Sequence, residues 1–257
     1  MQNLLSAVRE RVTADLKVLD TLRTEYANFP VVDGITVGQL LNGARYPVLV
    51  GAGTSSVDPQ RGLFIRGIPI GELQQQGVST DQVLGLLLTG ELPSQQIVTE
   101  IRARMVQIVN RLPVLTEVKR FIKSGAMTGA APMTRMEIAL AALGTNLRAN
   151  RSQSLSDDPL EVALDDCLTM ACGAMIAAAM INNPNLQLSM LWESLDDSRS
   201  LDAFYAEMMC PEPDVTVDVW REFIRLFQVN HCDHGRGNAS AHAATVVGST
   251  RGTLAEA

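Results

Sequence analysis

Residues 158–182, DPLEVALDDCLTMACGAMIAAAMIN, decide the fold class because they form the longest candidate helix in the chain. Pro159 stands at the start of this stretch and Pro184 lies just beyond its end, two positions where proline is compatible with helix boundaries. The middle is rich in alanine and apolar nearly all round, so other surfaces must cover it. We expect a second subunit to supply part of that cover, and a central helix of a monomer is the alternative.

Helical patterns continue on both sides of this stretch. Apolar residues recur at intervals of three and four from about Leu4 to Phe29, which predicts an amphipathic helix. In the stretch STDQVLGLLLTG, Ser79 can cap a helix that stops at Gly90. Further helices are predicted at about residues 93–111, 115–123, 134–147, 201–209 and 217–229.

The glycine-rich region between residues 30 and 70 breaks the helical pattern. Its short apolar pieces predict loops with two short strands, around Val48–Val50 and Leu63–Ile65. The sequence as a whole therefore predicts an all-α fold with a minor β-hairpin.

The composition of the chain limits the classes of function that it can have. The chain has 257 residues, 46% of them hydrophobic, and its net charge of −7 gives no electrostatic footprint for nucleic acid or an anionic membrane. The most apolar run, Cys167–Ile181, spans 15 residues, fewer than the roughly 20 that cross a bilayer. The four cysteines form no CxxC pair, so we expect reduced thiols in an intracellular protein.

All three histidines fall in the stretch NHCDHGRGNASAH, at positions 231, 234 and 242. A metal site could use His231 and His234, but His242 would lie about 16 Å along a continuous helix, too far for a shared ligand shell. A Ser–His or Cys–His nucleophile lacks a recognisable elbow, and helix capping by the histidines is the plain structural alternative. An anion-binding turn accounts best for the flanking glycines, with Asn238 capping the next helix and a histidine donating to a carboxylate.

Arginines supply the second kind of candidate, since 18 of the 21 cationic residues are arginine. Arg45 lies in ITVGQLLNGARYPVLVGAG, at a predicted helix end before a glycine-rich loop, where it could meet a phosphate. A solvated surface position is the alternative for Arg45. Arg102, Arg104 and Arg111 are expected on a solvated face.

Four stretches in the same order resemble the citrate synthase family, in its mitochondrial-type branch. They are ITVGQLLNGARY, TSSVDPQRGLFIRGIPIGEL, VLGLLLTGELPSQQ and HCDHGRGNASAHAATVVGST, and the resemblance is collinear from about residue 5 to residue 254. It implies that residues 1–257 form a citrate-synthase-like large helical domain, in an enzyme that condenses acetyl-CoA with oxaloacetate to citrate and CoA without a metal or other cofactor. It also implies the cytoplasm, or the mitochondrial matrix in a eukaryote.

The resemblance assigns roles to individual residues. His234 occupies the position that contacts oxaloacetate, His231 and Asn238 occupy neighbouring supporting positions, and Arg45 matches an arginine near the CoA phosphates. A homodimer through the helices at 133–147 and 158–182 is implied as well.

The sequence departs from the family pattern in ways that bear on catalysis. The family's proton transfers use a histidine in a later Gly-Pro-x-His-Gly segment and a later aspartate, and no histidine follows His242 here. Gly235 replaces the usual glutamate after the His-x-Asp-His turn, and the usual aromatic residue near Ile68 is missing. We therefore expect a truncated large domain that is inactive alone and needs a second chain or extension carrying the small domain. The alternatives are a non-catalytic CoA- or dicarboxylate-binding assembly or regulatory module, and an unrelated helical metal protein.

Overall fold

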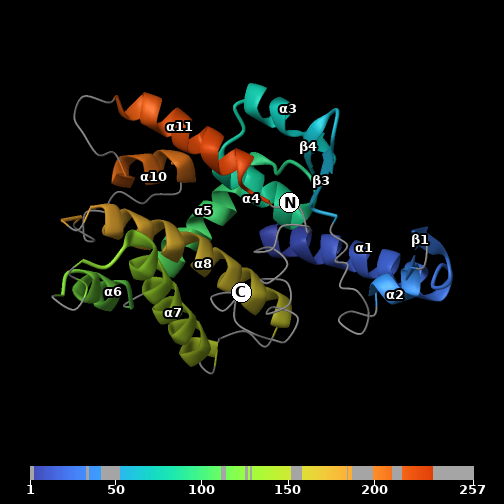
Figure 1. Cartoon of the computed structure of the whole chain (residues 1–257), viewed down its shortest axis with the longest axis horizontal. Helices are drawn as coiled ribbons and strands as arrows, with labels where there is room; N and C mark the ends of the chain where they lie inside the picture. The colour runs from blue at the N-terminus through green and yellow to red at the C-terminus, as the bar shows by residue number, and fades with distance from the viewer. Residues whose placement is uncertain are drawn as a thin grey trace.

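A computed structural model of the chain shows a helical molecule with a small sheet at one side (Figure 1). The structure describes residues 3–32, 35–41, 53–110, 114–124, 127, 129–151, 158–183, 185–186, 199–209 and 216–233. Its helices are α1 (Leu4–Thr24), α2 (Val37–Leu41), α3 (Ile70–Gln75), α4 (Thr80–Thr89), α5 (Gln95–Asn110), α6 (Val114–Ile122), α7 (Pro132–Arg151), α8 (Pro159–Asn182), α10 (Leu201–Met209) and α11 (Val217–Asn230). Its strands are β1 (Pro30–Val32), β2 (Ile35–Thr36), β3 (Ser55–Asp58), β4 (Gly62–Ile65) and β5 (Ile68–Pro69). The predicted all-α fold is confirmed.

The sheet is larger than the predicted hairpin. The strand predicted at Leu63–Ile65 is β4, which pairs antiparallel with β3 on one side and β5 on the other. The strand predicted at Val48–Val50 lies outside the described residues. A separate two-stranded ribbon, β1–β2, follows α1.

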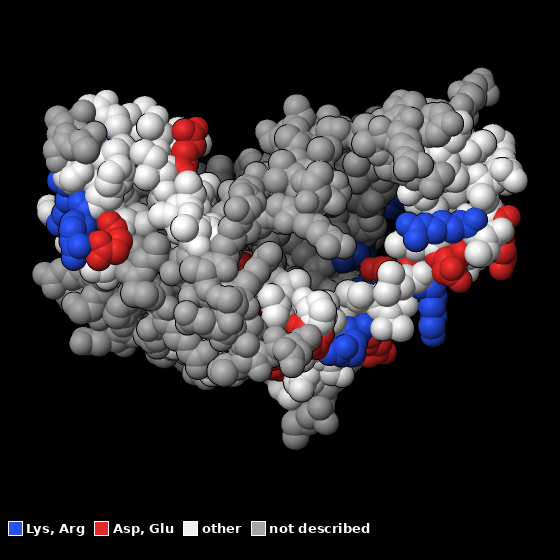
Figure 2. Space-filling view, turned by 90° about the horizontal axis from the view of Figure 1, so that it is seen from below, with Lys and Arg blue, Asp and Glu red and all other residues white. Residues whose placement is uncertain are grey.

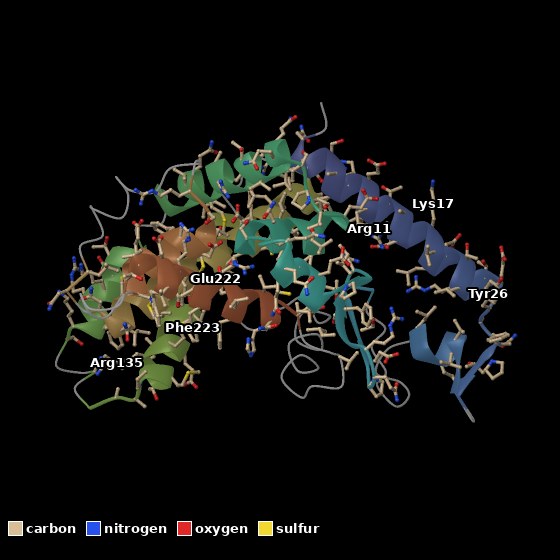
Figure 3. All side chains as sticks on the ribbon, turned by 90° about the horizontal axis from the view of Figure 1, so that it is seen from above. Arg11, Lys17, Tyr26, Arg135, Glu222 and Phe223 are labelled. Atoms are coloured by element: carbon tan, nitrogen blue, oxygen red, sulfur yellow. The ribbon has the colours of Figure 1, made fainter. Side chains whose placement is uncertain are left out.

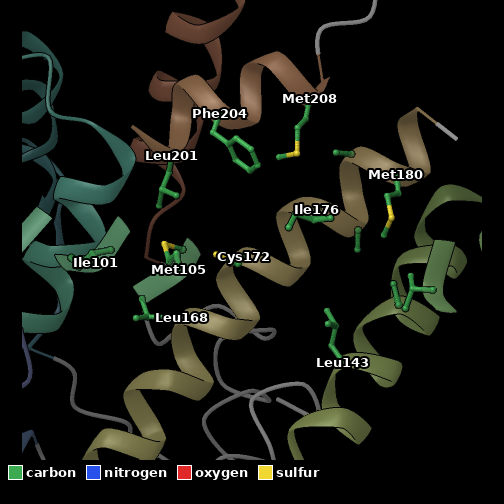
Figure 4. Close-up of a cluster of buried hydrophobic side chains, with 14 of the residues drawn as sticks. Ile101, Met105, Leu143, Leu168, Cys172, Ile176, Met180, Leu201, Phe204 and Met208 are labelled. Carbon is green, nitrogen blue, oxygen red and sulfur yellow. The ribbon is translucent and has the colours of Figure 1, made fainter. Parts of the chain in front are cut away.

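Helix α8 forms the centre of the molecule. It packs against α5, α6, α7 and α10 of the same chain. Figure 4 shows Leu168, Cys172 and Ile176 along α8, facing Met105 of α5 and Phe204 of α10. The chain itself therefore supplies cover for α8 that we expected in part from a second subunit.

Small residues let α8 approach its neighbour closely. A Cβ on Gly173 would lie 2.8 Å from Cδ1 of Leu143 on α7, so glycine permits the tight crossing. By length and composition α8 is the one helix among the described residues that could cross a membrane, and 56% of its most apolar window is buried within the chain. This burial is also what a central core helix shows.

Helix α4 begins and ends where its local sequence predicts. Ser79 and Gln82 form a capping box at its start, and Gly90 adopts the left-handed conformation (φ +89°) at its end. A Cβ on Gly85 would lie only 2.6 Å from Cγ of Pro93, so the following loop can fold back against α4 only over a glycine. These local requirements explain the LGLLLTGELP stretch.

The N-termini of α4 and α10 cap each other. Leu201 N donates to Asp81 Oδ1 (3.3 Å), and Thr80 N donates to Asp202 Oδ1 (3.2 Å). Arg102 of α5 pairs with the fully buried Asp81 at 2.5 Å, and its own side chain is only 11% exposed. The prediction that Arg102 lies on a solvated face is therefore wrong, because its partner is 21 residues away in sequence.

Charged side chains on the outside are mixed in sign. On the face seen in Figure 2, the described Lys and Arg side chains alternate with Asp and Glu, and they form no broad patch of one sign. Several of these charges are paired, such as Arg120 with Glu117 and Arg199 with Glu207. Among the described residues of this face, the surface gives no basic stripe of the kind that binds nucleic acid.

Candidate functional site

The candidate site begins where α11 ends, at His231, Cys232 and Asp233. The inner face of α11 is set by Ile224, Arg225 and Val229, which are buried. This placement brings the end of α11 against a satellite core of fully buried side chains. The satellite core consists of Ile65, Leu73, Val78, Val83, Leu86 and Val229, with Cys232 packed against it.

Arg225 locks α11 across the junction between α3 and α4. Its Nη1 donates to Val78 O at 3.1 Å, and its Nη2 donates to Gln74 O at 3.4 Å and to Glu222 Oε1 at 2.6 Å. The hydrogen bond to Glu222 raises the pKa of Arg225 and lowers the pKa of Glu222. The buried guanidinium thus bonds the Val78 carbonyl and adds a donor to the Gln74 carbonyl, which also accepts from Gly77 N within the turn.

Two further hydrogen bonds fasten the last turn of α11. Gln74 Nε2 donates to Asn230 Oδ1 at 2.6 Å, and Thr80 Oγ1 donates to Gln228 Oε1 at 2.7 Å. Both partners lie about 150 residues away in sequence, on α3 and α4. The residues just before the histidine turn are therefore held by side chains from the first third of the chain.

His231 is exposed and interacts with its own helix. Its Nδ1 lies 2.8 Å from Phe227 O, and its ring stacks on the Phe227 ring with centroids 4.3 Å apart. Because a carbonyl oxygen only accepts, Nδ1 carries the proton and donates to it. His231 thus helps to close the C-terminus of α11.

Cys232 is unsuited to nucleophilic chemistry. Burial, together with the neighbouring Asp233 carboxylate, raises the pKa of its thiol to about 11. The thiolate is the reactive form, so this thiol is protonated and inert near neutral pH. A Cys–His nucleophile built on Cys232 has no support in this geometry.

The remaining predicted site residues, Arg45, His234 and Asn238, lie outside the described residues. Within the part that is described, no group of three His, Cys, Asp or Glu side chains is placed to hold a metal ion. Sequence reasoning missed Arg66, whose guanidinium donates to Leu87 O beside the satellite core. A non-glycine residue at a two-residue hairpin turn was the signal that could have found it.

Comparison with known proteins assigns the family. The family model described as "Citrate synthase, C-terminal domain" matches residues 48–257. The chain is 28% identical to the mitochondrial 2-methylcitrate synthase of Aspergillus fumigatus over 232 residues, covering 85% of this chain and 48% of that protein. It is 27% identical to the mitochondrial citrate synthase 4 of Arabidopsis thaliana over 260 aligned positions, covering 96% of this chain and 52% of that protein.

A solved structure agrees with this family. The citrate synthase from Pyrobaculum aerophilum matches with a TM-score of 0.59 and 25% sequence identity, over 81% of this chain and 51% of that one. The chain thus spans about half the length of the relatives it matches. Because the family model covers most of the chain, and the fold agrees, the protein belongs to the citrate synthase family.

Proposed function

We propose that this chain is the large-domain portion of a citrate-synthase-type acyltransferase, which condenses acetyl-CoA with oxaloacetate to give citrate and CoA. The family match over residues 48–257 is the observation that carries the proposal. The assignment to the large domain rests on the order of the four motifs, whereas the matching family model is that of a C-terminal domain. Acetyl-CoA is a substrate here, and no cofactor is needed.

The proposed binding roles follow the motif positions. His234 contacts the keto or carboxylate oxygen of oxaloacetate, and His231 and Asn238 support the turn. Arg45 contacts CoA phosphate, for which a guanidinium fork is well shaped. The fastening of Gln228 and Asn230 supports this reading, because a binding turn needs a rigid approach.

We expect the 257-residue polypeptide to have negligible turnover on its own. General acid and general base groups each contribute roughly 10²–10⁴ in rate, and the Gly-Pro-x-His-Gly segment that carries the family's histidine is absent from this sequence. A second chain or extension would supply these groups and would also close the site to water.

A second candidate function is a non-catalytic module that binds CoA or a dicarboxylate in assembly or regulation. A departure from the family pattern favours it, since Gly235 stands where a glutamate usually follows the His-x-Asp-His turn. Binding of either ligand, without turnover and without a co-purifying partner, would support this candidate. A co-purifying polypeptide that contains Gly-Pro-x-His-Gly would instead support the first candidate, the large-domain portion of an acyltransferase.

The proposed assembly is a homodimer, with α7 and α8 as the helices named by the resemblance. Because α8 is covered within its own chain, α7 and a second surface must provide most of the contact. Helix α11 offers such a surface, in which Trp220, Phe223, Phe227 and His231 stack in sequence along one side. Phe223 and Phe227 are each about half exposed, and Figure 3 labels Phe223 on α11. Exposed aromatic rows of this kind mark interfaces.

The relatives do not fix the acyl substrate. One is named a 2-methylcitrate synthase and another a citrate synthase, at similar identity. Both relatives are named mitochondrial, so the motifs do not separate the two acyl substrates, and acetyl-CoA is our proposal. The same names support the mitochondrial matrix if the source is eukaryotic, and we propose the cytoplasm otherwise.

Calorimetry and a thiol-release assay on the purified chain test the proposal. We expect oxaloacetate binding, weakened at least tenfold by His234→Ala and unchanged by the matched control His242→Ala, with no enzyme-like release of CoA. Absence of oxaloacetate binding would contradict the assigned substrate site. Release of CoA at enzyme-like rates would contradict the expected inactivity.

A further inference from the structure

The chain has only three lysines, and one of them lies at the edge of the hydrophobic core around α8. They are Lys17, Lys119 and Lys123. Lys17 is exposed on α1, where Figure 3 labels it, and Lys123 is exposed just after α6. Lys119 is only partly exposed, so its amine is the one that folding partly removes from water.

The position of Lys119 follows from the amphipathic pattern of α6. Val118 and Ile122 are buried in the core around α8. Arg120 and Lys123 are exposed to solvent. Because successive residues lie about 100° apart around a helix, Lys119 falls at the border between the buried and the exposed face. Its amine is thus close to apolar groups and still within reach of a small reagent.

The amine of Lys119 bonds to a main-chain carbonyl beyond the end of α8. Its Nζ donates to Leu186 O, 67 residues away in sequence. Leu186 packs against the core around α8, and its own N–H donates to Asn183 O at 3.0 Å. A carbonyl oxygen accepts this hydrogen bond without supplying a full negative charge. The amine is therefore oriented but not neutralised.

The charges around Lys119 disfavour its protonated form. Among the described residues it forms no salt bridge, and Glu117, two positions before it, pairs with Arg120 at 2.7 Å. Lys123 adds a positive charge one turn further on, where its N–H donates to Lys119 O at 3.1 Å. Burial, and then the charge of Lys123, lowers the pKa of Lys119. Desolvation and a neighbouring cation are the two conditions that turn a lysine into a neutral nucleophile.

We infer that Lys119 is a site of lysine acylation whose acyl donor is a thioester of the acetyl-CoA class. The lone pair of Nζ attacks the thioester carbonyl, an amide C–N bond forms, and the C–S bond breaks. CoA leaves as the thiol and takes up the proton that the nitrogen loses, so no further reactant is needed. The product is neutral and bulkier at the point where Nζ meets Leu186 O. This inference does not rest on the condensation activity proposed above.

Incubation of the purified full chain with acetyl-CoA tests the inference. Mass spectrometry of peptides from a glutamate-specific protease gives the acetylation rate at each of the three lysines. We expect Lys119 to react at least about fivefold faster than the exposed Lys17, because its amine is activated by burial and a neighbouring charge. In urea, where the chain is unfolded, the three rates should be similar. Equal rates at Lys119 and Lys17 in the folded chain, or a preference for Lys119 that persists in urea, would overturn the inference.

Lys123→Gln and Lys17→Gln form a matched pair, because each replaces an exposed lysine. Lys123→Gln removes the neighbouring positive charge, so we expect acetylation at Lys119 to slow about twofold or more. Lys17→Gln should leave that rate unchanged, and thermal unfolding should show the wild-type Tm for both variants. An unchanged rate in Lys123→Gln, or equal slowing in the two variants, would contradict activation by the neighbouring charge.

A small thioester separates the reactivity of the amine from any binding of CoA. S-acetyl-N-acetylcysteamine carries the same acyl thioester but no nucleotide, and we expect it to show the same preference for Lys119. A preference seen with acetyl-CoA alone would place the selectivity in CoA binding and overturn the inference. If the chain fails to bind oxaloacetate, the proposed function fails, while these rates still decide the role of Lys119.

Discussion

The main core around α8 and the satellite core beside the sheet are stabilised by different means. The main core is a large cluster of aliphatic and methionine side chains from helices, including Leu168, Ile176 and Met180. The satellite core has six fully buried residues and depends on long-range hydrogen bonds from Arg66 and Arg225. The difference indicates a division of labour, in which the first core supplies stability and the second orients the end of α11.

Figure 1 shows how the two cores meet, with α10 lying between α8 and α11, and α4 lying nearer to the sheet. Contacts of α10 with α8, α4 and α11 make it the shared element. Helices α4 and α10 are connected by the reciprocal capping of Asp81 and Asp202. We therefore expect substitutions at this connection to have the largest effect on stability.

The largest effect is expected from Asp81→Ala. This change removes the buried carboxylate that pairs with the nearly buried Arg102 and removes the cap of α10, for a loss of about 3–5 kcal/mol of unfolding free energy. Urea unfolding measures it. Glu117→Ala, which removes a solvent-exposed pair with Arg120, is the control and should cost no more than about 1 kcal/mol. Equal losses of unfolding free energy in the two variants would show that Asp81 stabilises the protein no more than an exposed ion pair does.

The two cores can be compared directly through one substitution in each. Ile176→Ala should cost about 4 kcal/mol, because neighbouring helices surround the cavity, and Ile65→Ala about 2–3 kcal/mol, because the small sheet can relax. Urea unfolding gives both values, and calorimetry gives the oxaloacetate affinity of the folded proteins. Only Ile65→Ala should weaken binding. A stronger binding defect in Ile176→Ala would remove the proposed division of labour.

Glycine substitutions at the edge of the satellite core should have opposite signs. Gly90→Ala forces alanine into φ +89° and places its Cβ 2.8 Å from Cδ of Arg11, so we expect a loss of about 1–2 kcal/mol. Gly71→Ala, in α3, meets nothing within 4 Å and should stabilise by about 0.4–1 kcal/mol. Thermal unfolding of both variants checks the pair, and stabilisation by Gly90→Ala would contradict the role of the left-handed cap.

The smallest effect concerns pH. The hydrogen bond from Arg225 lowers the pKa of Glu222 below its ordinary 4.5, so the ionised carboxylate stabilises the fold above that value, and this contribution is lost as the pH falls below it. Glu222→Gln should therefore narrow the stability difference between pH 7 and pH 3 slightly. Urea midpoints at both pH values measure it. An unchanged or wider difference would exclude the pair as a contributor.

Local signals predicted much of the fold. The capping box of Ser79 and the stop at Gly90 placed α4 within a residue of its observed bounds, and α8 spans the predicted stretch. The predicted first helix, in contrast, ends at Thr24, five residues before Phe29. The helix predicted before Arg45 is represented by α2, whereas α3 was not predicted from periodicity, because six residues carry too little of it.

The candidate site was predictable only in part. The cluster of histidines drew attention to the end of α11, where His231 interacts with Phe227 O, and the supporting role assigned to His231 remains a prediction. Arg66 and Arg102 carried no such signal, because their roles come from distant partners such as Leu87 and Asp81. The assigned roles of His234, Asn238 and Arg45 remain predictions.

By itself, the sequence determined which segments become helices and where most of them end. Helix caps, prolines and periodic apolar residues act between residues that are three or four positions apart, so their effects can be predicted from the sequence alone. Only the tertiary structure decided which polar side chains are buried and which distant groups they form hydrogen bonds with. Thr80 meets Gln228 and Arg225 meets Val78 across nearly 150 residues, and only the packed cores bring these groups together.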